Sequence, residues 1–274
     1  MSMVWNQVRR TVLPGMCALL IVLSGCGETK VPPKSADELG LLGEGVLKVG
    51  MEFDRPPFMR WTEEEQGKNK GKPVPVGLDV ELANALSAQW GLNVELVEAE
   101  RGRLLAGLDA GLYDCVISAA APSPDADFSD PYAEYRQTIV IKPGSPPITS
   151  PENLSGLTVG YQTDTASAAY MEDLLSSGAV SCTVVQYDRT WVCLEDLRMG
   201  RIDAVLCDSA VARGYVRQER AAFEITWQEE ALSGTFAVAV KTGNEKLLRA
   251  VNDALKELER EENGTLSVVR KWLG

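Results

Sequence analysis

The sequence of 274 residues contains no histidine, and this absence excludes several kinds of catalytic and metal site. Ser-His-Asp and Cys-His catalysis need an imidazole, and so do all histidine metal sites. Cysteines are few, and none of those after residue 26 has the C-x-x-C spacing of a zinc or redox pair. Buried free thiols are the favoured interpretation, and a disulfide between Cys182 and Cys193 is the alternative. We expect no metal ion or cofactor.

Positive charge is also scarce. The chain has 27 lysine and arginine residues against 39 aspartate and glutamate residues, which gives a net charge of −12. No basic stripe with interleaved aromatic residues is present, and an acidic surface repels phosphate backbones. The composition therefore argues against nucleic acid as a partner.

Long hydrophobic runs are missing as well. The longest apolar stretch near the N-terminus, 11–23, has about 13 residues, against the ~20 that a spanning helix needs. Arg9 and Arg10 precede it and small residues follow it, so residues 1–25 have the layout of an export signal. The sequence LSGC that ends at Cys26 resembles the bacterial lipobox. We therefore expect a lipid on Cys26 that anchors the chain outside the cytosol, with residues 26–44 as a flexible linker.

What the sequence does contain is a repeated plan. LKVGMEFD at 47–54 is echoed by LTVGYQTD at 157–164, and LDAGLYDCVI at 108–117 is echoed in the same order by LRMGRIDAVL at 197–206. The second echo aligns Asp114 with Asp203, at the amino ends of two predicted strands. Each aspartate is expected to fix the turn that precedes its strand. The chain is therefore interpreted as two versions of one unit.

Each unit alternates strands with helices. Leu82, Leu86 and Trp90 recur at helical spacing, and short apolar runs such as LNVELVEA and DCVISAA indicate buried strands. This alternation predicts an α/β fold in which each unit is a mostly parallel sheet flanked by helices. The loop at 63–77 is interpreted as a solvated hairpin tip. A C-terminal helix with one apolar face has no counterpart in the second unit and is free to return to the first.

Parallel sheets bind ligands beyond the carboxyl ends of their strands. This rule selects four segments of the sequence, 51–55, 118–122, 161–166 and 207–209. If the two units face each other, the four segments line one cleft.

Several motifs together resemble the family 3 extracellular solute-binding proteins, the amino-acid receptors of ABC importers. They include LKVGMEFDRPPF, VGLDVELANAL, DFSDPYAEYRQTIVI, ENLSGLTVGYQTDTAS, GRIDAVLCDSAVA and the C-terminal AVNDALKELEREENGTLSVVRKWLG. The resemblance implies a two-lobed type II periplasmic-binding-protein (Venus flytrap) fold. Lobe 1 would comprise 45–141 and 233–274, and lobe 2 would comprise 142–232. The partners it implies are a small polar solute and the membrane subunits of an ABC permease.

The resemblance also implies ligand contacts. Asp208 matches the acid that meets the α-amino group of a ligand, although it could instead cap the helix that starts near Ser209. Thr163, Asp164 and Thr165 match the segment that meets the carboxylate at a helix N-terminus. Asp164 departs from the glycine common there, since its side chain could cap the helix and repel a carboxylate.

One expected ligand contact is missing. The family's usual carboxylate-binding arginine is replaced by Ala126, and no basic residue lies between Arg103 and Arg136. Arg55 and Arg101 stand where the family tends to have aromatic residues. A guanidinium can bind a carboxylate through two hydrogen bonds, so either arginine could replace the clamp. The alternative is that both are surface arginines.

Three further residues complete the candidate site. Glu52 could meet a second cation or lie at the surface, and Ser118 could contact the ligand or cap a turn. Ala120 belongs to the same strand-end segment as Ser118. The leading hypothesis is a lipid-anchored receptor that delivers an amino-acid-like solute to an ABC importer. The alternatives are a non-transporting sensor and a dehydratase-like enzyme with Glu52 or Asp208 as general acid, although no catalytic motif supports an enzyme.

Overall fold

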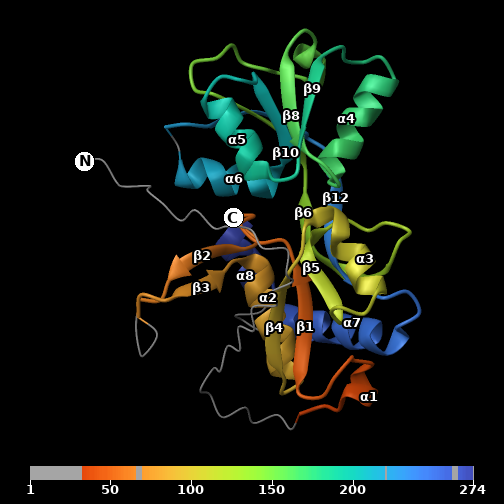
Figure 1. Ribbon diagram of the computed structural model, residues 1–274. Coiled ribbons are helices and arrows are strands. Elements are labelled where there is room, and N and C mark those ends of the chain that lie inside the picture. Colours follow the sequence, from red (N-terminus) through yellow and green to blue (C-terminus); the bar gives the residue numbers. More distant parts are fainter. Residues whose placement is uncertain (1–32, 66–69, 220, 261–264, 274) are drawn as a thin grey trace, which may run out of the picture.

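Two five-stranded sheets organise the computed structural model, which describes residues 33–65, 70–219, 221–260 and 265–273 (Figure 1). Each sheet forms one lobe with its own helices, and the lobes are stacked end to end. The chain passes from lobe 1 to lobe 2 and back, as the resemblance implies. The fold is α/β and two-lobed.

The sheet of lobe 1 has the strand order β4-β1-β5-β12-β6. Its strands are β1 (Val46–Met51), β4 (Asn93–Glu98), β5 (Cys115–Ala120), β6 (Asp127–Tyr135) and β12 (Gly234–Val240). A separate hairpin joins β2 (Arg60–Glu63) to β3 (Pro73–Val76), as expected around the loop at 63–77. The helical elements of this lobe are α1 (Ala36–Leu39), α2 (Leu78–Gln89), η2 (Arg101–Arg103), α3 (Leu104–Asp109), α7 (Glu245–Arg260) and α8 (Thr265–Leu273).

The sheet of lobe 2 has the order β11-β7-β10-β8-β9. Its strands are β7 (Gln137–Ile141), β8 (Thr158–Gln162), β9 (Thr183–Tyr187), β10 (Ala204–Asp208) and β11 (Glu224–Gln228). The helical elements are η3 (Pro151–Leu154), α4 (Ala166–Ser176), α5 (Thr190–Arg198) and α6 (Ser209–Gln218). Both sheets are mixed: four strands run in one direction, and one strand, β12 in lobe 1 and β7 in lobe 2, runs antiparallel to its two neighbours.

The internal repeat appears in the topology. The parallel triplet β4-β1-β5 of lobe 1 has the same arrangement as β9-β8-β10 of lobe 2. The Asp114 carboxylate accepts a hydrogen bond from the Lys48 N–H at 2.8 Å, and the Asp203 carboxylate accepts one from the Thr158 N–H at 2.8 Å. These are equivalent positions of the two echoes. Each aspartate therefore ties the start of its lobe's first strand to the turn before β5 or β10.

The lobe boundary differs from the expected one. β7 pairs with β10 and β11 of the second sheet, so the chain crosses at Arg136 and not after residue 141. The return crossing lies between Gln228 and Gly234. The two crossings are adjacent, because the Glu229 N–H donates to the Gln137 carbonyl at 2.9 Å and the Ser233 N–H donates to the Tyr135 carbonyl at 3.1 Å.

The linker expected at 26–44 is partly folded onto lobe 1. Ser35 caps α1, Leu39 is only 1% exposed, and the Lys34 N–H donates to the Trp90 carbonyl at 2.9 Å. A flexible linker is therefore wrong for this part, because Leu39 is buried in the lobe 1 core. The export signal and Cys26 lie outside the described residues. No helix in the described ranges is both long enough and apolar enough to cross a membrane.

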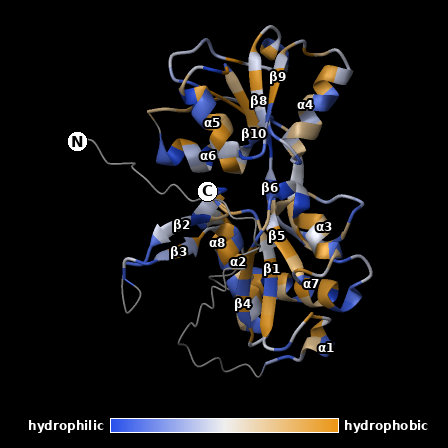
Figure 2. Ribbon diagram, in the orientation of Figure 1, coloured by the Kyte–Doolittle hydropathy of each residue, from blue (hydrophilic) through white to orange (hydrophobic). Residues whose placement is uncertain are grey.

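The core follows the predicted periodicity. The apolar face of α7, with Leu247, Val251, Leu255 and Leu258, is buried against lobe 1. In Figure 2 the strands and the inward faces of the helices are the most hydrophobic parts of both lobes. The four described cysteines are free thiols, so Cys182 and Cys193 are not bonded to each other.

Candidate functional site

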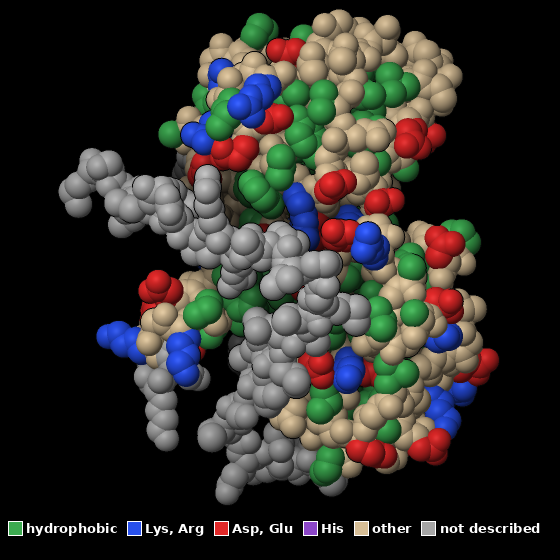
Figure 3. Space-filling model, viewed as in Figure 1, with side chains coloured by type: hydrophobic (Ala, Val, Ile, Leu, Met, Phe, Trp, Pro, Cys, Tyr) green, Lys and Arg blue, Asp and Glu red, His purple; other side chains and the backbone are tan. Residues whose placement is uncertain are grey.

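The carboxyl ends of the parallel strands from both sheets meet where the lobes face each other. Glu52 directly follows β1, Ser118 and Ala120 end β5, and Gln162 and Asp208 end β8 and β10. In Figure 3 basic and acidic side chains gather at this junction between the lobes. The four segments that the sequence selects therefore meet where the two lobes face each other.

An ion pair between Arg55 and Asp208 connects the lobes. Arg55 Nη2 donates to Asp208 Oδ2 at 2.9 Å, and the two side chains are only 5% and 6% exposed. Burial alone would lower the pKa of Arg55, but the carboxylates of Asp208 and Glu52 outweigh it and the pKa is raised. The guanidinium also lies 5.6 Å from the centre of the Phe58 ring. Arg55 is therefore not a surface residue.

Asp208 has a second structural role. Its Oδ1 accepts a hydrogen bond from the Val211 N–H at 2.8 Å, so it caps α6. The predicted helix cap is confirmed, and the predicted contact with the ligand's amino group stays a prediction. Its charged partner in this structure is Arg55.

Glu52 lies at the centre of the interlobe contacts and is 2% exposed, so the surface alternative is wrong. Arg101 Nη1 lies 3.3 Å and Arg55 Nε lies 3.7 Å from its Oε2. On its other oxygen it accepts a hydrogen bond from Gln162 Nε2 at 2.5 Å, and Arg189 Nη1 lies at 3.9 Å. Both lobes therefore contribute donors to one buried carboxylate.

Arg101 reaches from lobe 1 to lobe 2. Its Nη1 and Nη2 donate to the Ser118 and Ala119 carbonyls at 3.0 and 2.8 Å. Its Nε donates to the Asp164 carbonyl at 3.0 Å. Burial and then the neighbouring Arg55 lower the pKa of Arg101. The side chain is 10% exposed, so Arg101 is not a free surface residue either.

The hydroxyl groups that were expected to contact a ligand have partners within the protein. Ser118 Oγ accepts from the Glu52 N–H at 2.9 Å, and Thr163 Oγ1 donates to the Tyr187 carbonyl at 3.4 Å. Thr165, and not Asp164, caps α4, because its Oγ1 accepts from the Ala168 N–H at 3.2 Å. Asp164 instead adopts a positive φ of 56° in the preceding turn.

Asp79 is a functional candidate that the sequence did not single out. Its carboxylate accepts hydrogen bonds at 2.8 Å from the Ala119 N–H and from the Tyr132 hydroxyl. Burial raises its pKa to about 6. Ala119 has a φ of 45°, so Asp79 holds the end of β5 in the conformation that presents two carbonyls to Arg101.

Gln162 and Arg189 were also missed. Gln162 accepts from Thr190 Oγ1 at 2.6 Å, which orients its amide toward Glu52. Arg189 Nη1 donates to the Phe53 carbonyl of the opposite lobe at 2.9 Å. Gln162 could have been predicted from the repeat, because the alignment of the two echoes places it opposite Glu52. No sequence pattern indicated a role for Arg189.

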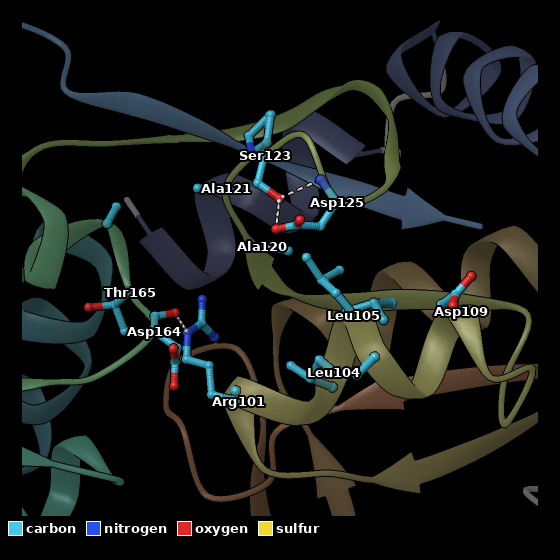
Figure 4. Close-up of a pocket in the computed structure, with 15 residues that line it drawn as sticks. Arg101, Leu104, Leu105, Asp109, Ala120, Ala121, Ser123, Asp125, Asp164 and Thr165 are labelled. Carbon is cyan, nitrogen blue, oxygen red and sulfur yellow. Dashed lines mark hydrogen bonds between the residues drawn. The ribbon is translucent and has the colours of Figure 1, made fainter. Parts of the chain in front are cut away.

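A cavity of about 640 Å³ lies beside this network, between the lobes (Figure 4). Among the described residues, Arg101 is the only basic one in the lining, which also includes Leu104, Leu105, Ala120, Ala121, Ser123, Asp125, Asp164 and Thr165. Ala126 is 9% exposed and packs with Leu104 and Val116 in a small apolar cluster. Arg101 therefore supplies the cation of the cavity, and Glu52, Arg55, Thr163 and Asp208 do not line it.

The arrangement provides hydrogen-bond donors and charges and no metal centre. Within the described ranges no group of three or more Asp, Glu or Cys side chains could hold a metal ion. The interlobe site is therefore suited to hold a polar solute by ion pairs and hydrogen bonds.

Comparisons with known proteins agree with this architecture. The profile of the bacterial extracellular solute-binding proteins, family 3, matches residues 47–274. The L-cystine-binding protein TcyJ of Escherichia coli (strain K12) is 31% identical over 275 residues, covering 97% of this chain and 96% of that protein. The arginine-binding extracellular protein ArtP of Bacillus subtilis (strain 168) is 29% identical over 259 residues, covering 92% of each chain. The structure of an ancestral arginine-binding protein bound to arginine has a TM-score of 0.74 and 33% identity, covering 84% of this chain and 99% of that one.

Proposed function

This chain belongs to the bacterial extracellular solute-binding proteins of family 3, and from this membership we propose that it captures a small polar, amino-acid-like solute between its two lobes. Relatives that cover nearly the whole chain are named for binding cystine or arginine. The observation that carries the proposal is the set of buried charges at the facing strand ends, above all Glu52, Arg55, Arg101 and Asp208.

Of these charges, Arg101 couples solute binding to lobe closure. Arg101 contacts the Asp164 carbonyl of lobe 2 while it lines the cavity, so a solute beside it touches both lobes. Thr165 and the first residue of α4 lie on the lobe 2 side of the same cavity. A solute that contacts both lobes binds the closed form more tightly than the open form, and it shifts the population toward closure by that difference.

Capture is followed by delivery. We propose that the closed form presents its solute to the membrane subunits of an ABC importer, on the extracytoplasmic face of the membrane. A lipid on Cys26 would hold the receptor there, which the sequence LSGC supports.

We propose binding without turnover. A dehydratase-like enzyme would need Glu52 or Asp208 to give up a proton, but each of these carboxylates is paired with an arginine in the interior of the cleft. Neither side chain lines the cavity, so neither is placed to protonate a solute held there.

The test is a thermal-shift screen of the full-length protein in detergent against L-arginine, L-cystine, other amino acids, dicarboxylates, polyamines and small peptides. A solute present at ~100 times its dissociation constant stabilises the fold by about 2.7 kcal/mol, which is a readily measured shift. Arg101→Met should abolish the shift. Arg103→Met, which removes an arginine whose side chain is 80% exposed two residues away, should leave it unchanged. The absence of a shift with every amino acid would refute the amino-acid proposal.

A further inference from the structure

We propose that Gly214 of α6 is a positioning residue for solute capture, because it lets lobe 2 pack directly on the backbone of lobe 1 and so favours the closed form with or without a solute. This inference rests on the proposed function and specifies how the two lobes are held together. It concerns the side of the junction that faces away from the cavity. In Figure 1 α6 and α8 meet on that side, whereas the cavity lies beside α3 and the start of α4 on the other.

Glycine is an unexpected residue at position 214. It lies in the interior of α6, where glycine is less favourable than alanine, and its φ is not positive. Neither the helix nor the backbone conformation therefore requires it. A Cβ at this position would lie 2.9 Å from both Cδ and N of Pro57 and 3.0 Å from the carbonyl carbon of Pro56. The requirement for glycine therefore comes from lobe 1, at the turn formed by residues 55–59, which we call the proline turn.

The atoms that Gly214 meets cannot rotate away from it. Backbone atoms and a proline ring move only with the chain that carries them, unlike the end of a long side chain. An ordinary van der Waals contact of a Cβ is 3.4–4 Å, so a side chain at position 214 would move α6 and the proline turn apart by about half an ångström or more. Gly214 therefore sets how closely the two segments approach.

Both segments are fixed within their own lobes. The Pro57 carbonyl accepts a hydrogen bond from the Leu78 N–H at 3.0 Å, which ties the proline turn to the start of α2. In lobe 2 the start of α6 is tied to the crossing, where the Ser209 N–H donates to the Arg136 carbonyl at 2.8 Å. A displacement at Gly214 would therefore move the lobes relative to each other.

Two arginines on α6 contact lobe 1 as well. Arg213 Nη1 donates to the Leu273 carbonyl at 3.3 Å. One turn later, Arg217 Nη1 donates to the Trp272 carbonyl at 3.3 Å. Both carbonyls belong to the last turn of α8, where carbonyl groups lack helical partners and carry partial negative charge. Because these contacts and the one at Gly214 join protein groups alone, none of them needs a solute.

The contact at Gly214 also sets the ion pair between the lobes. Arg55 directly precedes Pro56, and Asp208 caps α6, so the two charged groups are carried by the same segments that meet at Gly214. Their distance of 2.9 Å would lengthen if α6 and the proline turn moved apart. A side chain at position 214 would therefore weaken the packing and the ion pair together, and it would shift the population toward the open form.

The test compares Gly214→Ala with the unsubstituted full-length protein in detergent. Spin labels on non-natural residues at the exposed positions Arg60 and Gln218 flank the contact, and double electron–electron resonance measures the distance between them. We expect Gly214→Ala to show an additional, longer distance without solute. By isothermal titration calorimetry it should bind L-arginine or L-cystine about tenfold more weakly, because fewer molecules are closed. Urea unfolding should change little, since alanine favours the helix.

Two further variants complete the test. A Cβ at Gly43 would have no atom within 4 Å, and the φ of this residue is not positive, so Gly43→Ala is the matched control and should change neither distance nor affinity. Arg217→Met removes an exposed side chain that contacts α8. It should show the longer distance in a smaller fraction of molecules, with binding about threefold weaker, and it serves as the test if Gly214→Ala folds poorly.

Each outcome bears on a different claim. Equal distances in Gly214→Ala and the unsubstituted chain would overturn the inference, and so would an unchanged affinity for an amino acid that binds the unsubstituted chain. A large loss of unfolding free energy with an unchanged distance would assign Gly214 to lobe 2 alone and would also overturn it. If neither amino acid binds the unsubstituted chain, the result counts against the proposed function, and the distances still decide the inference.

Discussion

The two lobes share a backbone plan and differ where they face each other. The first strands β1 and β8 are each followed by an aspartate with a positive φ, 57° at Asp54 and 56° at Asp164. Two residues before these aspartates, lobe 1 has Glu52 and lobe 2 has Gln162, and these equivalent side chains hydrogen-bond to each other across the cleft. Residues that shape the strands and turns are the same in both lobes, whereas those at the facing edge differ and are complementary.

Equivalent positions in the two lobes have different roles, one in the local structure and the other in the contact between the lobes. One residue after the aspartate, lobe 2 has Thr165, which caps a helix, and lobe 1 has Arg55, which crosses the cleft to Asp208. Asp208 itself is equivalent to Ala119 of lobe 1 when the alignment of the second echo is continued by two residues. Charge at the site is therefore distributed unevenly, and variants at equivalent positions should have unequal effects.

The largest loss of stability is expected from Asp208→Ala, which gives lobe 2 the alanine that lobe 1 already has at the equivalent position. The substitution leaves the Arg55 guanidinium buried without its counter-ion and should lower the free energy of unfolding by about 3 to 5 kcal/mol. Urea unfolding measures it. Arg55→Met in the same chain should recover most of the loss, and a loss below about 1 kcal/mol would contradict the pairing.

A smaller loss of stability is expected from substitutions at the second residue of α2 in lobe 1 and of α4 in lobe 2. In α2 this residue is Asp79, whose pKa is raised to about 6, and in α4 it is Ser167, which donates to Gln137 Oε1 at 2.7 Å. A raised pKa means that the folded state favours protonated Asp79. Its contribution is therefore fully present below the unfolded value of 3.8 and is lost as pH rises through about 6.

The measurement is the free energy of unfolding from pH 4 to pH 7. Relative to Asp79→Asn, the unsubstituted chain should lose up to about 3 kcal/mol as pH rises over this range. Ser167→Ala should give a difference that does not vary with pH. If the difference in unfolding free energy between the unsubstituted chain and Asp79→Asn did not change with pH, a raised pKa of Asp79 would be refuted.

Next come the equivalent glycines of the first strands. A Cβ at Gly50 would lie 2.5 Å from the Tyr113 ring, whose hydroxyl is fixed by a hydrogen bond to the Leu104 carbonyl. A Cβ at Gly160 would lie 2.5 Å from Cys193 Sγ, a smaller group. We expect Gly50→Ala to destabilise by about 2 to 3 kcal/mol and Gly160→Ala by about 1 to 2 kcal/mol, measured by urea unfolding. The reverse order would mean that the second lobe is the more rigid one.

The smallest effect is expected at the two aspartates that tie down the first strands. Asp114 is 4% exposed and also accepts a hydrogen bond from the Leu42 N–H at 2.6 Å, whereas Asp203 is exposed. Asp114→Ala should therefore cost about 2 kcal/mol and Asp203→Ala about 1 kcal/mol. Thermal unfolding of both variants in one buffer checks the order, and equal losses would argue against burial as the cause.

The sequence predicted helices and strands better than it predicted contacts between residues far apart in the chain. Helical and strand periodicity predicted the elements because it depends on neighbouring residues, and the two echoes predicted two equivalent units. The crossing at Arg136 was missed because β6 and β7 are separated by this one residue, without a glycine or proline between them. The helix α1 was missed because a four-residue helix shows little periodicity.

The site was predicted in position and only partly in its contacts. Strand ends indicated Glu52, Ser118 and Asp208, because the carboxyl edge of a parallel sheet is fixed by topology. The pairing of Arg55 with Asp208 joins residues 153 positions apart, and it depends on how the lobes face each other. Asp79 was missed because its importance comes from the conformation of Ala119, which no local pattern encodes.

The adjacency of the two crossings makes lobe 2 a separable insert. Tyr135 at the end of β6 is paired with Gly234 at the start of β12, so the chain leaves and rejoins the sheet of lobe 1 at one place. A short turn that connects these two residues would preserve every strand of that sheet. The same position could therefore accept a second lobe from a relative, which would allow chimaeric receptors to be assembled by exchanging whole lobes.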